Sequence, residues 1–282
     1  MTEKMITSGG AEICTGTFGD PSEPPVLLIM GQMASMLWWP ADFCDRLANG
    51  GRFVLRYDNR DTGRSTGYEP GEATYTLDDL AGDAIAVLDG YDIERAHLVG
   101  MSLGGGVAQL VALEHPARVA SVTAISTTKV GEPDPSLPGP DPGYMEHAGA
   151  FEDLDWSDTQ ALGDLIVEDA RQVAGSRHPF DEAAARDLVT RDLERARNPQ
   201  SLMNHGMLGG GEKAQDRLGE IAAPFLVIHG SADPIFPHQH GVALAEAVGG
   251  AELVTLEGGG HELNQGDWDQ ILDAILSHTG SR

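Results

Sequence analysis

Positive charge is scarce in this chain of 282 residues. Lys and Arg together number 18, of which only three are lysine, against 44 Asp and Glu residues, and the formal net charge is −26. A nucleic-acid-binding surface needs clustered Lys and Arg side chains to neutralise phosphates, and anionic lipid headgroups repel an acidic surface. The composition therefore predicts that neither nucleic acid nor a membrane surface is a partner.

Cysteines and long apolar runs are also few. Cys14 and Cys44 form no Cys-x-x-Cys pair, which favours two buried thiols over a disulfide or a redox pair. The longest apolar runs hold about six residues, far short of the roughly 20 that a membrane-spanning helix needs. Residues 1–8 lack the basic flank and apolar core of a signal peptide. We therefore expect a soluble, cytoplasmic protein.

Short apolar runs rich in Val, Ile and Leu recur along the chain. They lie at 25–30, 53–57, 96–101, 119–125, 224–229 and 251–256. Runs without polar alternation are typical of strands that are buried on both faces of a parallel sheet. Stretches with helical periodicity lie between them, at 77–88, 105–114, 242–248 and 271–276. This alternation predicts an α/β fold with a mostly parallel, doubly wound sheet.

The alternation stops between Thr127 and Arg217. Prolines at 131–143 prevent regular structure there, and three helical patches follow, near 158–174, 181–197 and 200–208. We interpret this segment as a helical cap over the sheet with flexible hinges at 131–143 and 209–211; the alternative is a long loop whose helices have no special role. The predicted division is residues 1–126 as the first part of the core, 127–217 as the cap and 218–282 as the second part of the core.

One motif carries chemistry. Gly100-Met101-Ser102-Leu103-Gly104 has the pattern Gly-x-Ser-x-Gly, directly after a predicted strand and at the start of a predicted helix. A sharp strand-to-helix turn of this kind exposes the serine hydroxyl as a nucleophile, and the glycines avoid side-chain clashes. The alternative is a serine that caps the helix. The context favours a nucleophile elbow.

A serine nucleophile needs a histidine base and a carboxylate that orients it. In folds with this elbow the chain order is Ser, acid, His, with each residue beyond the end of a strand. Asp233 and His261 follow two consecutive predicted strands and fit this order. Asp58 precedes the serine and fits a loop-bracing role better. His229 is expected to be a core histidine, and His238 with His240 a helix start rather than a metal pair.

The oxyanion of an acyl-transfer intermediate needs two amide donors. One is expected to be the backbone N–H of Leu103, next to the nucleophile, and the other the N–H of Gln32 in the turn Gly31-Gln32-Met33. The chain has no phosphate-binding loop, no zinc-protease helix and no dinucleotide fingerprint. We therefore expect no metal and no organic cofactor.

Four segments together resemble the α/β-hydrolase superfamily: Met30-Gly31-Gln32, the run from Arg56 to Ser65, the elbow, and 230–233. The resemblance extends from about Ile13 to Ile275. Within the superfamily the chain is similar to the aclacinomycin methylesterases and their capped esterase relatives, through the Arg56–Ser65 run and the Val-Leu-Asp-Gly at 87–90. The resemblance implies a catalytic triad of Ser102, Asp233 and His261, with oxyanion amides at Gln32 and Leu103. The chain has Met30 and Gln32 where many relatives have His and Gly.

These observations predict a serine hydrolase that cleaves a small or medium apolar carboxylic ester. The pocket is expected to include Gly31, Met33, Trp38, Met203 and Met207, roofed by apolar cap residues; these could instead form a small core within the cap, above all Trp156 and Ile166. Lactone hydrolysis, carbon–carbon bond hydrolysis and metal-free perhydrolysis use the same triad and stay open. A protein of this fold that only binds a small ligand is the alternative outside enzymes.

Overall fold

An eight-stranded sheet forms the centre of the molecule. The computed structural model describes residues 3–280, and its strand order is β1-β2-β4-β3-β5-β6-β7-β8. Six strands pair in parallel: β3 (Pro25–Ile29), β4 (Phe53–Tyr57), β5 (Ala96–Met101), β6 (Val119–Ile125), β7 (Phe225–Gly230) and β8 (Glu252–Leu256). The predicted mostly parallel α/β sheet is confirmed, and each of these strands matches a predicted apolar run to within one or two residues.

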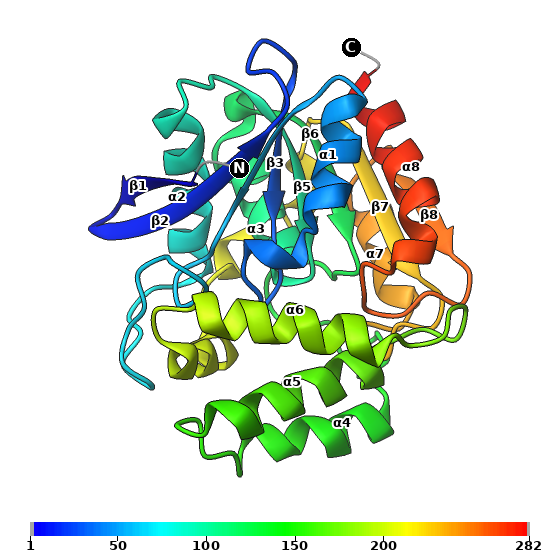
Figure 1. The fold of residues 1–282 in the computed structure, drawn as a ribbon. Coiled ribbons are helices and arrows are strands. Elements are labelled where there is room, and N and C mark those ends of the chain that lie inside the picture. The colour runs from blue at the N-terminus through cyan, green and yellow to red at the C-terminus, as the bar shows by residue number, and fades with distance from the viewer. Residues whose placement is uncertain (1–2, 281–282) are drawn as a thin grey trace.

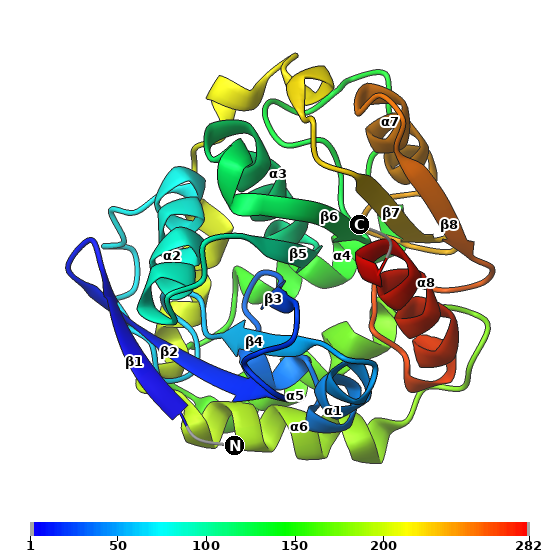
Figure 2. The same ribbon diagram turned by 90° about the horizontal axis from the view of Figure 1, so that it is seen from above.

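Helices cover both faces of the sheet (Figure 2). One face carries α2 (Leu77–Gly90), α3 (Leu103–Glu114) and α7 (Gln239–Ala247), and the other carries α1 (Ala41–Asn49) and α8 (Trp268–Gly280). Alternate residues of one strand enter the two cores: Leu27 and Ile29 pack on one side, and Val26 and Leu28 on the other. This two-sided burial is the reason that the central strands are continuously apolar.

The antiparallel edge of the sheet was not predicted. Strands β1 (Glu3–Ser8) and β2 (Ala11–Phe18) form a hairpin, and β2 continues antiparallel to β4. Its turn is Gly9-Gly10, both with positive φ, which suits a tight hairpin. In β1 the side chains of Ile6 and Ser8 are buried, and Thr7 between them is exposed. Such a half-exposed strand lacks the continuous apolar run by which the central strands were predicted.

A helical insertion, hereafter the cap, separates β6 from β7. It contains α4 (Pro142–Ala148), α5 (Thr159–Gln172) and α6 (Glu182–Arg195), which lie together across one end of the sheet (Figure 1). The predicted patch at 200–208 is a 3₁₀ segment, η4 (Pro199–Met207), rather than an α-helix. Shorter 3₁₀ turns are η1 (Met36–Trp38), η2 (Pro116–Arg118), η3 (Gly149–Phe151), η5 (Glu212–Ala214), η6 (Leu218–Glu220) and η7 (Gln265–Asp267).

The glycine run after η4 is tied to the core. The carbonyl oxygen of Gly209 accepts a hydrogen bond from the N–H of Leu77 at 3.0 Å, and the N–H of Gly211 donates to Asp78 Oδ2 at 2.9 Å. Both partners belong to the first turn of α2, so this segment is anchored where a flexible hinge was expected. Cys14 and Cys44 are free and buried, as predicted. Within residues 3–280 no helix is long and apolar enough to cross a bilayer.

Candidate active site

Ser102 lies between the end of β5 and the start of α3 in an unusual backbone conformation. Its φ is 52° and its ψ is −121°, a region that costs a non-glycine residue about 1–3 kcal/mol. Its N–H donates to the carbonyl oxygen of Ile125 at 2.9 Å, and its own carbonyl oxygen accepts the Thr127 hydroxyl at 2.8 Å. The serine side chain makes no capping hydrogen bond to α3. The hydroxyl is therefore held at the end of the sheet without a structural use in the helix.

Two glycines allow this turn. A Cβ at Gly100 would lie 2.1 Å from the carbonyl oxygen of Gly104, and a Cβ at Gly104 would lie 2.2 Å from the carbonyl oxygen of Ile29. Both neighbours are backbone atoms that cannot move aside. The Gly-x-Ser-x-Gly pattern is therefore explained by close packing of α3 against β5 and β3.

Asp233 and His261 come together beyond β7 and β8. His261 Nδ1 lies 2.8 Å from Asp233 Oδ2, and the other carboxylate oxygen accepts the N–H groups of Ile235 and Phe236, both at 2.9 Å. Burial acts to raise the pKa of Asp233, but the charge and hydrogen bond of His261 outweigh it and lower the pKa below its usual value. A carboxylate acceptor makes Nδ1 the donor, which leaves His261 Nε2 available as a base.

The serine and the histidine share one edge of the sheet but are not bonded. Neighbouring parallel strands end at the same edge, and β5, which precedes Ser102, is separated from β8, which precedes His261, by β6 and β7. Among residues 3–280 no hydrogen bond joins Ser102 Oγ to His261. Catalytic hydrogen bonds of this kind are often long before substrate binds.

The loop that follows β3, residues 31–39, lies against the serine; we call it the oxyanion loop. A Cβ at Gly31 would lie 3.2 Å from Ser102 Cβ and 3.8 Å from its Oγ, so any larger residue there would press on the serine. The next residue, Gln32, is exposed, and its backbone N–H has no hydrogen-bond partner within the described chain. The N–H of Met33 is different, because it donates to His205 Nδ1 at 2.9 Å.

Comparison with known proteins agrees with this architecture. A family model described as the alpha/beta hydrolase fold matches residues 24–264. The chain belongs to the alpha/beta hydrolase fold family. This hydrolase-fold protein is 34% identical to the rhodomycin D methylesterase DauP of a Streptomyces species, over 99% of this chain and 98% of that protein. It is 33% identical to the rhodomycin D methylesterase DnrP of Streptomyces peucetius, with the same coverage.

A solved structure adds evidence about the fold alone. The esterase RhEst1 from a Rhodococcus species superposes on this hydrolase-fold chain with a TM-score of 0.81 at 20% identity, covering 100% of this chain and 99% of the other. The predicted resemblance to α/β-hydrolases, and within them to methylesterase-like proteins, is confirmed.

The polar residues weighed against the triad have other contacts in this hydrolase fold. Asp58 is fully buried; it accepts the N–H of Met36 and of Arg64, both at 2.9 Å, and pairs with Arg195 at 2.7 Å. His229 is also fully buried; its Nε2 contacts the carbonyl oxygen of Phe236 at 2.7 Å and lies farther, 3.6 Å, from Asp233 Oδ2. Within residues 3–280 no group of His, Cys, Asp and Glu has the arrangement of a metal site.

The expected apolar roof is only partly present. Leu162, Val167, Val189, Leu193 and Leu202 form a core within the cap, and Met33, Trp38, Trp156 and Ile166 pack against it. This arrangement matches the alternative in which Trp156 and Ile166 belong to the cap's own core. Met207 is 57% exposed and Met145 is 53% exposed, so neither lies under a closed roof. Met203 is half-buried.

The sequence did not predict a polar cluster around Asp169, on the part of the cap that contacts His261. Asp169 of α5 lies 3.3 Å from His147 Nε2, and its negative charge acts on nearby Tyr144, whose pKa is raised mainly by burial. It stands one helical turn before Val173, whose carbonyl oxygen accepts the His261 N–H at 2.9 Å. Burial raises the pKa of Asp169, although the charges of His147 and His261 partly offset this. Its partners are distant in sequence, so no local motif could have revealed it.

Proposed function

We propose that this protein is a carboxylic ester hydrolase that works through an acyl-enzyme on Ser102. The observation that carries the proposal is the strained Ser102 backbone, whose hydroxyl does not cap α3 and adjoins the oxyanion loop. Strain at a polar residue indicates a functional constraint. The Asp233–His261 hydrogen bond at the same edge of the sheet supplies the base that such a hydroxyl needs. Two full-length methylesterase relatives support ester hydrolysis.

The proposed reaction has two halves. Ser102 Oγ attacks the ester carbonyl carbon while His261 Nε2 takes the hydroxyl proton, and the tetrahedral oxyanion is stabilised by the N–H groups of Gln32 and Leu103. The intermediate then expels the alkoxide, which receives that proton from His261. A water molecule, deprotonated by His261, then attacks the acyl-enzyme. The second tetrahedral intermediate releases the carboxylic acid as His261 returns that proton to Ser102 Oγ. Asp233 holds the histidine in the required tautomer throughout.

We propose a small or medium-sized apolar carboxylic ester as the substrate and the methyl ester as the first form to test, because the relatives named above are methylesterases. The division into two core segments, 1–126 and 218–282, with the cap at 127–217, is proposed with it. A cytoplasmic location, and a reaction without metal or cofactor, remain predictions.

The test is an ester panel read with a covalent probe. The protein is incubated with p-nitrophenyl acetate, with methyl esters of graded acyl length and with lactones, and its serine is titrated with a fluorophosphonate. Ester turnover together with stoichiometric labelling supports the proposal. Turnover of lactones alone would redirect it to lactone hydrolysis, and neither turnover nor labelling would favour a ligand-binding protein.

A further inference from the structure

The oxyanion loop is held mainly by side chains that come from outside it. The N–H of Met33 donates to His205 Nδ1 at 2.9 Å, the N–H of Ser35 to Asp192 Oδ2 at 3.5 Å, and the N–H of Met36 to Asp58 Oδ1 at 2.9 Å. His205 belongs to η4 and Asp192 to α6, both in the cap. The cap thus contacts the backbone of the loop that carries the proposed Gln32 donor.

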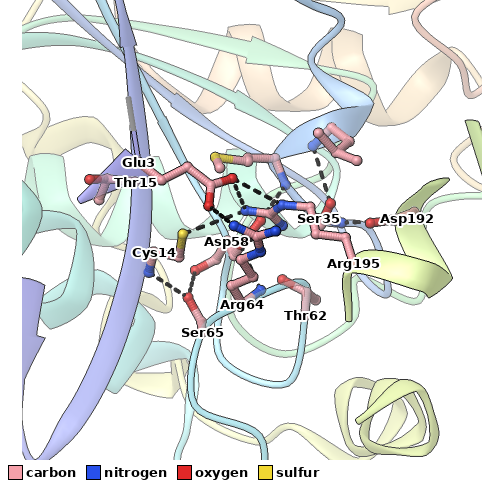
Figure 3. Close-up of polar contacts among 12 residues, drawn as sticks. Glu3, Cys14, Thr15, Ser35, Asp58, Thr62, Arg64, Ser65, Asp192 and Arg195 are labelled. Atoms are coloured by element: carbon pink, nitrogen blue, oxygen red, sulfur yellow. Dashed lines mark hydrogen bonds and ion pairs between the residues drawn. The ribbon is translucent and has the colours of Figure 1, made fainter. Parts of the chain in front are cut away.

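Two residues on one face of α6 make the main connection. Asp192 accepts the indole N–H of Trp38 at 2.7 Å, and it is buried. Arg195, three residues later and therefore on the same helix face, pairs with Asp58 Oδ2 at 2.7 Å and with Glu3 Oε1 at 3.0 Å. Figure 3 shows the part of this network that joins Arg195 of α6 to Glu3 at the start of β1 and to Asp58 in the loop after β4. Asp58 is the shared element, since its two oxygens contact Met36 and Arg195.

His205 fixes the orientation of the peptide that follows Gln32. Its Nε2 lies 2.7 Å from the carbonyl oxygen of Arg60, so Nε2 must be the donor and Nδ1 the acceptor for the N–H of Met33. Met33 has a φ of 59°, a left-handed conformation that is uncommon for methionine and that this hydrogen bond helps to hold. Burial lowers the pKa of His205, which favours the neutral ring that this arrangement needs.

Apolar packing reinforces the polar contacts. Met33 and Trp38 are the oxyanion-loop residues that pack against the cap's own core. Two backbone donors of the loop, Met33 and Ser35, thus bond to the cap. The side chains of Met33 and Trp38 pack on the cap as well, while Gly31 lies against Ser102.

We propose that Asp192, Arg195 and His205 are positioning residues through which the cap sets the geometry of the oxyanion hole. This inference rests on the proposed function, because it assumes that the N–H of Gln32 stabilises the oxyanion. The cap and the oxyanion loop then act as one unit. A loss of any of these contacts displaces the Gln32 donor, which lowers transition-state stabilisation more than substrate binding.

The test compares three variants with a control on the same helix. Asp192→Ala and His205→Ala remove loop contacts, and Asp192→Asn keeps an acceptor for Trp38. Arg191→Gln is the control, since among residues 3–280 the one ion-pair partner of Arg191 is the exposed Asp187 on the surface of α6. Each is assayed with p-nitrophenyl acetate, normalised to active sites by fluorophosphonate titration, and inhibited with an arylboronic acid, whose tetrahedral serine adduct mimics the oxyanion.

We expect kcat/KM per active site to fall about 10- to 100-fold in both alanine variants, less than the 10²–10³ lost with a whole donor. The boronate inhibition constant should rise by the same factor, with KM changed less than about threefold. Asp192→Asn should recover most of the loss, and Arg191→Gln should behave as wild type. If Asp192→Ala does not fold, Trp38→Phe removes the same hydrogen bond from the other partner and should show a smaller loss of the same kind.

Unchanged boronate affinity in the alanine variants, with only a lower unfolding midpoint, would show a purely structural role and overturn the inference. Ser102→Ala separates this outcome from failure of the proposed function. If Ser102→Ala is inactive while the cap variants keep wild-type boronate affinity, only the positioning role is wrong. If Ser102→Ala hydrolyses ester as fast as wild type, both proposals are wrong.

Discussion

At the scale of single residues, the central contact of the site is the hydrogen bond between His261 and Asp233. The carboxylate uses one oxygen for two backbone N–H groups and the other for the imidazole, so its position is fixed independently of the histidine. A ring contact between Phe236 and His261, with centroids 5.7 Å apart, limits the orientation of the imidazole further. The histidine is thus oriented before any substrate arrives.

Replacing the acid tests this assignment. Asp233→Asn should lower kcat about 10⁴-fold, because an amide at this place favours the wrong tautomer of the histidine. Steady-state kinetics with p-nitrophenyl acetate measures the effect, and circular dichroism controls for folding. Asp58→Asn should be less damaging, since Asp58 contacts the oxyanion loop and Arg195 instead of the imidazole. A larger loss for Asp58→Asn would mean that the acid is wrongly assigned.

At the scale of elements, the start of α3 is where sequence pattern and structure correspond most directly. Gly104 faces the backbone of β3, whereas a Cβ at Gly106, two residues later, would meet its nearest atom at 3.9 Å. Close packing therefore requires glycine at position 104 of this helix, whereas position 106 has room for a larger side chain.

An alanine pair distinguishes them. Gly104→Ala should destabilise the fold by several kcal/mol, or prevent folding, because its Cβ would clash with an immovable carbonyl oxygen. Gly106→Ala should be neutral or stabilise by up to about 1 kcal/mol, since alanine has the higher helix propensity. Urea denaturation measures both. Equal stability of the two variants would contradict the close packing of α3 on β3.

Some elements of the fold could be predicted from the sequence and others could not. The parallel strands and the elbow were predictable because apolar runs and the Gly-x-Ser-x-Gly spacing are local signals. Strand β1 was missed because its exposed face dilutes its apolar pattern. The contacts of Asp192 and His205 with the oxyanion loop, and of Arg195 with Asp58, were missed for a different reason. They join residues about 150 positions apart, and no local spacing encodes such pairs.

At the scale of the whole molecule, the free energy of unfolding should depend on pH through a histidine of the sheet. His97 lies on β5, far along the strand from Ser102, and burial lowers its pKa to about 4, with the charges of Arg52, His278 and Arg95 acting in the same direction. Its Nδ1 contacts the Ser121 hydroxyl at 2.8 Å. Because the ordinary value is about 6.5, the unfolded chain takes up a proton before the folded one does.

The free energy of unfolding should therefore fall on acidification, because the unfolded chain binds a proton at His97 more readily. Its contribution is fully present above about pH 6.5 and declines as the pH falls toward about 4. Asp58 and Asp192, whose pKa values burial raises, act in the opposite sense, so the contribution is measured as a difference. His97→Gln should lose less stability than wild type between pH 7.5 and pH 4.5 in urea titrations, by on the order of 1 kcal/mol. Identical losses would contradict a half-buried His97 that is neutral in the folded protein.

Substrate length tests how the cap covers the site. Each CH₂ buried is worth up to about 0.8 kcal/mol, so kcat/KM should rise with acyl length and then fall once the pocket is full. Met207 and Gln32 are both exposed, so the cap does not cover either side chain. A kinetic series of methyl esters from acetate upward measures the optimum. Steady activity on emulsified long-chain triglyceride, or no optimum, would contradict a cap that limits the pocket.

The proposed nucleophile is tested most directly by removing the Ser102 hydroxyl and by labelling it. Ser102→Ala should keep the free energy of unfolding within about 1 kcal/mol of wild type, yet lower kcat by about 10⁶-fold, as removal of a triad serine does elsewhere. In the wild-type protein a fluorophosphonate should label a single site, and mass spectrometry of the digested protein should place the label on Ser102. Labelling at another residue, or more than about a thousandth of wild-type kcat in purified Ser102→Ala, would contradict the proposed nucleophile.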